Sequence, residues 1–280
     1  SIISTLKYGS FLIGPAVAGI FLANEKTAAA LWLDAASFLV SAATLFLLPD
    51  FPAAISTDSG KRGWSFLQED WRDALEFLRR NALFTSLFAL NAGSMILALT
   101  ADSQEVVFAR VALGLGEFGY GMMVVAAGIG AILGSLVIAL VAGRVSNAWL
   151  MGAGSFLSET GYLIYALSGN FWWAVAGLVT LGLFGSAANV GFTTYMQYTV
   201  PVSRMGRLQN ILGPPQQILS IVFILCGGFA ASVYGVRALM IAMTVPMCII
   251  GMIMAVLVFA PRNRAKMSEP DAVNASDPGV

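Results

Sequence analysis

The stretch PDFPAAISTDSGKRGWSFLQEDWRDALEFLRRN, residues 49–81, decides how this sequence folds. It is the one long charged passage in the chain, and long apolar runs stand on both sides of it. Pro, Ser, Asp and Gly recur through residues 49–63 and favour a linker, whereas apolar residues return at steps of three and four over residues 64–80. The second pattern predicts an amphipathic helix that lies on a membrane surface or against the ends of other helices.

The composition indicates that lipid is the solvent for most of the chain. Its 280 residues are 58% hydrophobic and 11% charged, with a mean hydropathy of +0.80, whereas soluble domains carry about 25% charged residues. Lys plus Arg and Asp plus Glu each total 15, so net charge points to no nucleic acid. The absence of histidine from the sequence excludes His-based metal sites and Ser/His or Cys/His catalysis, and we expect neither an enzyme nor a cofactor.

Uncharged runs long enough to cross about 30 Å of hydrocarbon as helices predict the fold class. We expect an all-α polytopic membrane protein with eight transmembrane helices, two before the polar stretch and six after it. The predicted spans are residues 8–23, 28–48, 82–100, 118–142, 148–167, 171–200, 211–234 and 238–260. The predicted domains are a two-helix part (1–48), a cytoplasmic linker (49–81), a six-helix bundle (82–260) and a disordered cytoplasmic tail (261–280).

The placement of basic residues predicts the orientation, because Lys and Arg are in excess on the cytoplasmic side of membrane proteins. With the N-terminus inside, the inside segments hold all Lys and Arg residues except Lys26, Arg110 and Arg237. We therefore expect a multi-pass protein of the plasma membrane with both termini in the cytoplasm.

The first predicted span carries a face of small residues around a proline. Its members are Ser10, Gly14, Pro15, Ala18 and Gly19. Proline kinks a helix, and small residues let another helix approach closely. The spacing resembles the antiporter motif of exporters of the major facilitator superfamily, although Ser or Ala stands at three of the motif's glycines.

Other stretches resemble the macrolide-efflux and siderophore-exporter branch of that superfamily. The run WLDAASFL, residues 32–39, is similar to its sixth helix. The residues YG at 120–121, followed by GIGAILG at 128–134 and the short loop at 143–144, are also similar to this branch. The run QYTVP at 197–201, followed by RMGR at 204–207, resembles the segment between its tenth and eleventh helices. The resemblance covers residues 1–260.

This resemblance implies a secondary transporter, a proton-driven exporter of drug-like or siderophore-like small molecules. Its partners would be the substrate, protons and the lipid bilayer, and two six-helix bundles would alternate access to a midplane site. The resemblance also implies that this chain lacks the family's first four helices, and a further candidate partner is another segment or chain that carries them. An alternative of a different class stays open. The chain would then be a truncated half that does not transport, either as a remnant or as an assembly partner of another polypeptide.

Polar residues inside the predicted spans are candidates for the substrate or ion path. Carboxylates within a membrane are functional candidates by default, which selects Glu159 for proton binding and Asp34 for an ionic or hydrogen-bonding role. Pairing with a neighbour is the alternative for Glu159. By resemblance, Asn91, Asn189 and Thr193 line a central cavity, and Gln216 stands on the next helix. Interhelical hydrogen bonding is the alternative for these uncharged residues.

Arginines at predicted cytoplasmic helix ends are candidates for a latch. Arg144, Arg204 and Arg207 would pair with carboxylates of the other bundle, or they would only satisfy the excess of positive charge inside. Pro214-Pro215 at the entry of its predicted span is read either as a hinge or as a helix start. Three charged residues in or beside an outer loop predict a solvated face: Glu105, Arg110 and Glu117.

Overall fold

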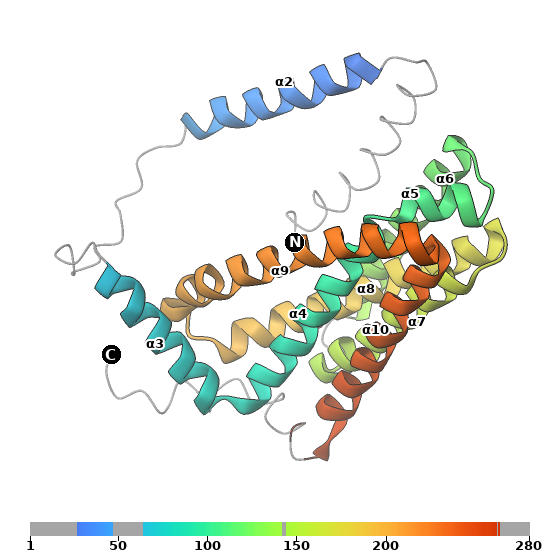
Figure 1. Ribbon diagram of the computed structural model, residues 1–280. Coiled ribbons are helices and arrows are strands. Elements are labelled where there is room, and N and C mark those ends of the chain that lie inside the picture. The colour runs from blue at the N-terminus through green and yellow to red at the C-terminus, as the bar shows by residue number, and fades with distance from the viewer. Residues whose placement is uncertain (1–26, 47–63, 142–143, 262, 264–280) are drawn as a thin grey trace.

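The computed structural model describes residues 27–46, 64–141, 144–261 and 263, and every regular element within these ranges is helical (Figure 1). The elements are α2 (Thr27–Phe46), α3 (Trp64–Arg80), α4 (Ala82–Asp102), α5 (Glu105–Val107), the π-helical turn η1 (Phe108–Ala112), α6 (Glu117–Val141), α7 (Asn147–Leu167), α8 (Phe171–Thr199), α9 (Val202–Tyr234) and α10 (Val236–Phe259). The prediction of an all-helical protein is confirmed for these ranges.

Five of these helices are long and apolar enough to cross a membrane, namely α4, α6, α8, α9 and α10. Helix α7 has 21 residues, the same length as α4, but is less hydrophobic on average. The predicted span at 8–23, with Ser10, Gly14, Pro15, Ala18 and Gly19, lies outside the described residues, as does nearly all of the predicted tail. The chain is a polytopic helical membrane protein, and the count of eight spans stays a prediction.

The predicted start of the span at residue 211 is wrong as a helix boundary. Helix α9 begins at Val202, and Pro214 and Pro215 lie inside it. The apolar run begins only after Arg204, Arg207 and Asn210. Hydropathy therefore predicted the start of the apolar part of the helix rather than the start of the helix itself. The 33-residue helix is about 50 Å long at 1.5 Å per residue, longer than the hydrocarbon layer. The helix-start interpretation of the two prolines is therefore excluded.

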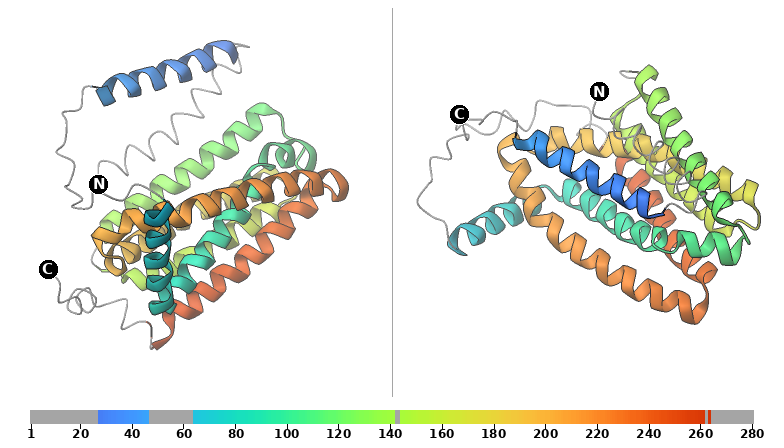
Figure 2. Two further views of the ribbon diagram at one scale, coloured as in Figure 1. Left: turned by 60° about the vertical axis from the view of Figure 1, so that its left-hand side comes forward. Right: turned by 90° about the horizontal axis from the view of Figure 1, so that it is seen from above.

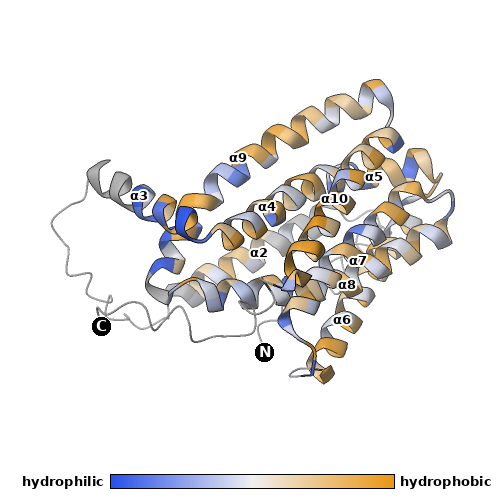
Figure 3. Ribbon diagram, turned by 90° about the horizontal axis from the view of Figure 1, so that it is seen from below, coloured by the Kyte–Doolittle hydropathy of each residue, from blue (hydrophilic) through white to orange (hydrophobic). Residues whose placement is uncertain are grey.

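The bundle helices pack as an open series in the order α6, α8, α7, α10, α4 and α9. Helix α2 lies apart from them, and its described side chains are exposed (Figures 1 and 2). Apolar residues run along the bundle helices, whereas hydrophilic residues gather on α3 and near the helix ends (Figure 3). A large apolar outer surface of this kind suits contact with lipid tails or with further helices.

Glycines bring α6, α7 and α8 into backbone contact. A Cβ atom on Gly130 of α6 would lie 2.5 Å from the carbonyl oxygen of Val179 on α8. One on Gly161 of α7 would lie 2.5 Å from the amide nitrogen of Leu181 on α8. Small residues hold membrane helices together in this way, because apolar burial gives little drive within lipid. These contacts fix α7 beside α8 and so position the middle of α7.

Two apolar cores occupy the two ends of the bundle. One draws on α3, α4, α7, α8, α9 and α10 and includes Phe77, Phe84 and Tyr195. The other draws on η1 and on α4, α6, α7, α8 and α10 and includes Phe108 and Tyr165. We call the first end the arginine end, because six of the described arginines belong to the segments that meet there: Arg72, Arg79, Arg80, Arg144, Arg204 and Arg207.

Candidate functional site

Glu159 lies near the middle of α7, where α7 meets α4 and α10. Its side chain is buried, with 8% of its surface exposed. The hydroxyl of Ser94 on α4 donates a hydrogen bond to Glu159 Oε1. Gly251 on α10 makes room for it, because a Cβ atom there would lie 3.0 Å from Glu159 Cγ. Three helices therefore converge on this carboxyl group.

The second carboxyl oxygen of Glu159 has no partner. Oε2 is buried and accepts no hydrogen bond from the described residues. The neighbour found for this side chain is a neutral serine rather than a cation, so the geometry is not that of an ion pair. An uncompensated charge is costly in an apolar interior, and a proton on the carboxyl group removes that charge. The arrangement can therefore gain and lose a proton at Oε2.

The uncharged candidates lie on three different helices. Asn91 is half-buried on α4, one turn before Ser94, and Gln216 is half-buried on α9. Asn189 and Thr193 are exposed and stand one turn apart on α8. Within the described part of the chain, no side-chain hydrogen bond joins any of the four to another helix. Their role as cavity wall stays a prediction.

Asp34, the remaining acidic candidate, belongs to α2. Its side chain lies outside the described residues, so its interactions are not defined by the structure.

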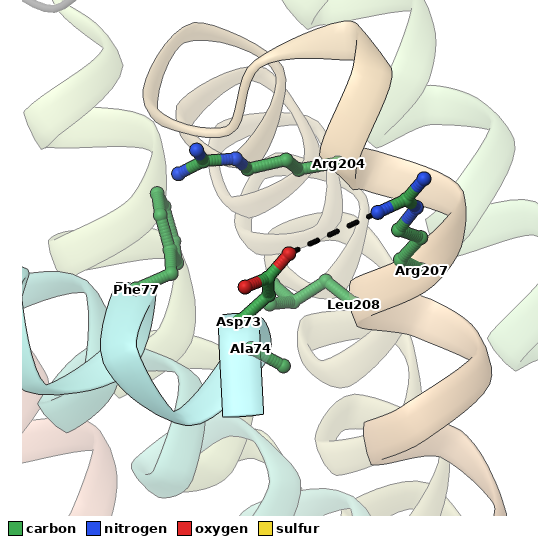
Figure 4. Close-up of a pocket in the computed structure, with 6 residues that line it drawn as sticks. All are labelled: Asp73, Ala74, Phe77, Arg204, Arg207 and Leu208. Atoms are coloured by element: carbon green, nitrogen blue, oxygen red, sulfur yellow. Dashed lines mark ion pairs between the residues drawn. The ribbon is translucent and has the colours of Figure 1, made fainter. Parts of the chain in front are cut away.

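The candidate latch arginines meet a carboxylate of α3. Arg207 Nη1 lies 3.9 Å from Asp73 Oδ2, and Arg204 reaches across the same pocket toward Phe77 (Figure 4). Ala74 and Leu208 complete the pocket lining. Arg144 is exposed beside the start of α7. The latch prediction named carboxylates of another bundle, whereas the described partner of Arg207 comes from the amphipathic helix α3.

The opposite end of the bundle holds an acid–tyrosine cluster, which we define as Asp102, Glu105, Tyr120, Tyr162 and Tyr165. The Tyr162 hydroxyl on α7 donates a hydrogen bond to Asp102 Oδ1 at the end of α4. Glu105 is hydrogen-bonded to Tyr120 of α6. We call this end the acid–tyrosine end. Sequence reasoning missed the cluster, although Glu159, Tyr162 and Tyr165 recur at three-residue steps and so share one side of α7.

The prediction of a solvated face is wrong for Glu105. Its side chain is half-buried. Burial, and then the nearby charge of Asp102, raise the pKa of Glu105 to about 7, while its hydrogen bond with Tyr120 acts in the opposite direction. Glu105 is the first residue of the short α5, which lies just beyond the end of α4. The group therefore titrates near neutral pH rather than staying ionised.

The described arginines of this end are engaged elsewhere. Arg110 Nη2 lies 2.8 Å from Glu117 Oε1, and both side chains are more than half exposed, as a solvated face predicts. Arg237 donates a hydrogen bond of 3.2 Å to the Ala112 carbonyl and lies over the Phe108 ring. Neither guanidinium makes an ion pair with Asp102 or Glu105 within the described ranges.

A metal site finds no support in the described ranges, where no group of three or more His, Cys, Asp and Glu residues is placed to hold an ion.

Comparisons with known proteins agree with the helical membrane architecture. The family model for the Major Facilitator Superfamily matches residues 105–276, more than half of the chain. An uncharacterized MFS-type transporter, YfiS of Bacillus subtilis (strain 168), is 24% identical over 263 residues, which are 90% of this chain and 61% of that protein. The chain thus spans less than two-thirds of the length of this curated relative. No solved structure matches it.

Proposed function

The chain belongs to the major facilitator superfamily, and on that premise we propose that it works as a proton-driven exporter of drug-like or siderophore-like small molecules. Family membership supports a secondary transporter. Export is supported by the small-residue motif in residues 10–19 and by the runs at 32–39 and 197–207. Alternating access needs two bundles, and we propose that helices on another segment or chain complete the second one.

The observation that carries this proposal is the unpartnered Oε2 of Glu159. Protonation there removes a charge from the junction of α4, α7 and α10, and loss of the proton restores it. The two states differ in how tightly these three helices can pack, because a buried charge needs polar partners and a neutral carboxylic acid needs fewer. A proton can therefore bias which of two helix arrangements is favoured.

Asn91 gives a route from this switch to the substrate. It stands one turn before Ser94 on α4, and Ser94 bonds Glu159 directly. A substrate held by Asn91, Asn189, Thr193 or Gln216 would shift α4 against α7 and so alter the contact with the carboxyl group. Thermodynamic linkage makes the coupling between proton and substrate reciprocal. If a proton on Glu159 weakens the binding of substrate, bound substrate weakens the binding of the proton by the same factor.

The proposed location is the plasma membrane, with the arginine end in the cytoplasm. The excess of Arg at that end supports this orientation. Arg144, Arg204 and Arg207 would then stabilise the state in which the cytoplasmic helix ends are closed, with Asp73 as one partner of Arg207.

The test is solute flux in vesicles that contain the chain together with the segment or chain that completes the second bundle, under an imposed pH gradient. A fluorescent lipophilic cation and a hydroxamate chelate serve as probes. Wild type is expected to move at least one probe, and Glu159→Gln is expected to lose the flux that the gradient drives. Glu117→Gln, which removes an exposed acid on α6, is the matched control and should retain it.

Two outcomes contradict the proposal. Equal gradient-driven flux in wild type and Glu159→Gln would remove Glu159 from the coupling. No flux of either probe from the well-inserted, completed assembly would favour the alternative of a half that does not transport.

A further inference from the structure

We propose that the Asp102–Tyr162 pair is the proton entrance of the bundle, through which protons from the solution at the acid–tyrosine end reach Glu159. The inference rests on the proposed coupling role of Glu159. It adds the end of the bundle at which the proton enters and the residues that pass it on.

The pair joins an exposed carboxylate to a buried hydroxyl. Asp102 is exposed at the end of α4, whereas 2% of the Tyr162 surface is exposed. The Tyr162 hydroxyl donates its hydrogen bond outward, to Asp102 Oδ1. A proton that binds Asp102 from solution is therefore already in hydrogen-bond contact with a group in the apolar interior.

The same tyrosine leads to Glu159. It stands three residues after Glu159 on α7, an axial step of about 4.5 Å that places the two side chains on the same side of the helix. The Ser94–Glu159 and Asp102–Tyr162 bonds both connect α4 to α7, and their partners on α4 stand eight residues apart, an axial distance of about 12 Å. No hydrogen bond joins Tyr162 to Oε2 of Glu159 among the described residues, so a water molecule has to complete the path. Protonated Asp102 can give its proton to the Tyr162 oxygen while the hydroxyl proton of Tyr162 passes to this water, which gives one of its own protons to Oε2 of Glu159. Tyr162 ends the step neutral, and one proton has moved.

The surroundings of Asp102 favour a bound proton over a bound arginine. Its neighbours with titratable groups are Glu105, Tyr120, Tyr162 and Tyr165. Asp102 ends α4 and Glu105 begins α5 three residues later, so their two carboxyl groups repel each other, and Asp102 meets the negative end of the α4 dipole. The arginines of this end are engaged with Glu117 and with the Ala112 carbonyl. A proton shared between Asp102 and Glu105 relieves this repulsion.

Tyr165 gives independent support for a proton path in this place. The residue is fully buried, and its hydroxyl has no hydrogen-bond partner among the described residues. That hydroxyl lies within electrostatic range of Glu105, Tyr120 and Asp102, and its ring packs beside that of Tyr162. A buried polar group without a partner is rare in folded proteins and costs stability. A role of the Tyr165 hydroxyl in proton exchange beside Tyr162 would explain why this position carries a tyrosine.

The test measures how fast Glu159 gains its proton. The chain is placed in vesicles with the acid–tyrosine end facing the outer solution, and the outer pH is lowered rapidly. Infrared absorption of the protonated carboxyl group reports the uptake, and subtraction of the Glu159→Gln signal assigns the band to Glu159. Tyr162→Phe and Asp102→Asn are expected to slow the appearance of this band by at least about tenfold, with little change in its final amplitude. A change in packing alone would alter the amplitude or the folding rather than the rate.

The control is Tyr195→Phe, which removes the hydroxyl of a buried tyrosine at the arginine end and should respond as wild type does. If Tyr162→Phe and Asp102→Asn both respond as fast as wild type, the entrance lies elsewhere and the inference is overturned, while the coupling role of Glu159 stands. If wild type shows no Glu159 band at any pH, the coupling role and the entrance fail together.

Discussion

The two ends of the bundle are built on different principles. At the arginine end, aromatic and aliphatic side chains from α3, α4, α8 and α9 pack together, and the charges lie outside this core on exposed side chains. At the acid–tyrosine end, the half-buried carboxyl group of Glu105 and the buried hydroxyl groups of Tyr162 and Tyr165 lie within or beside the core that contains Phe108. One end is suited to hold helices together, and the other is suited to respond to protons.

Loss of packing at the arginine end should give the largest effect on stability. Phe84 is 2% exposed and its ring contacts those of Phe77, Phe88 and Tyr195. Phe84→Ala is expected to lower the free energy of unfolding by about 3–5 kcal/mol, the usual cost of removing a buried aromatic ring. Unfolding in detergent, followed by circular dichroism, measures the change. Phe118→Ala is the control, because Phe118 is 82% exposed and should lose little.

The acid–tyrosine end should make stability depend on pH. The pKa of Glu105 is about 7 in the folded chain and near 4.5 in an unfolded one, so the folded state holds the proton more tightly. The stability that this group contributes is fully present below pH 4.5 and is lost as the pH rises through 7. Thermal unfolding of wild type between these values should shift to lower temperature with rising pH. Glu105→Gln should flatten this part of the profile, and an unchanged slope would contradict the burial of Glu105.

The ion pair at the arginine end should give the smallest effect. Arg207 and Asp73 are 3.9 Å apart, and each side chain is about half exposed. Exposed pairs of this kind contribute about 0–1 kcal/mol, and salt weakens them further. Arg207→Ala should therefore change the free energy of unfolding far less than Phe84→Ala. A loss as large as that of the buried ring would mean that charge rather than packing holds this end together.

Local pattern was enough to predict the amphipathic helix. The apolar side chains of α3 recur at three- and four-residue steps, and the helix runs from Trp64 to Arg80 as predicted. Hydropathy placed the interiors of the other described helices but not the start of α9, because the polar first turns of that helix extend beyond the apolar run. Hydropathy predicts the part of a segment that crosses the membrane, whereas the helix can extend beyond that part.

The candidate site could be predicted only in part. Glu159 stood out because a carboxylate is rare within an apolar run, and the structure adds Ser94 and Gly251 as its neighbours. The Asp102–Tyr162 pair joins residues 60 positions apart, so it depends on the register between α4 and α7. No local pattern specifies that register. Glu105 was misjudged for the same reason, since its surroundings include Tyr120 of α6, which is distant from it in local pattern.

The central claim is that Glu159 exchanges a proton when substrate binds. The most direct measurement adds a transported probe to the purified chain in lightly buffered detergent solution and follows released protons with a pH-sensitive dye. Linkage predicts that wild type releases up to about one proton for each probe bound and that Glu159→Gln binds the probe but releases none. Equal proton release from wild type and Glu159→Gln would contradict the claim.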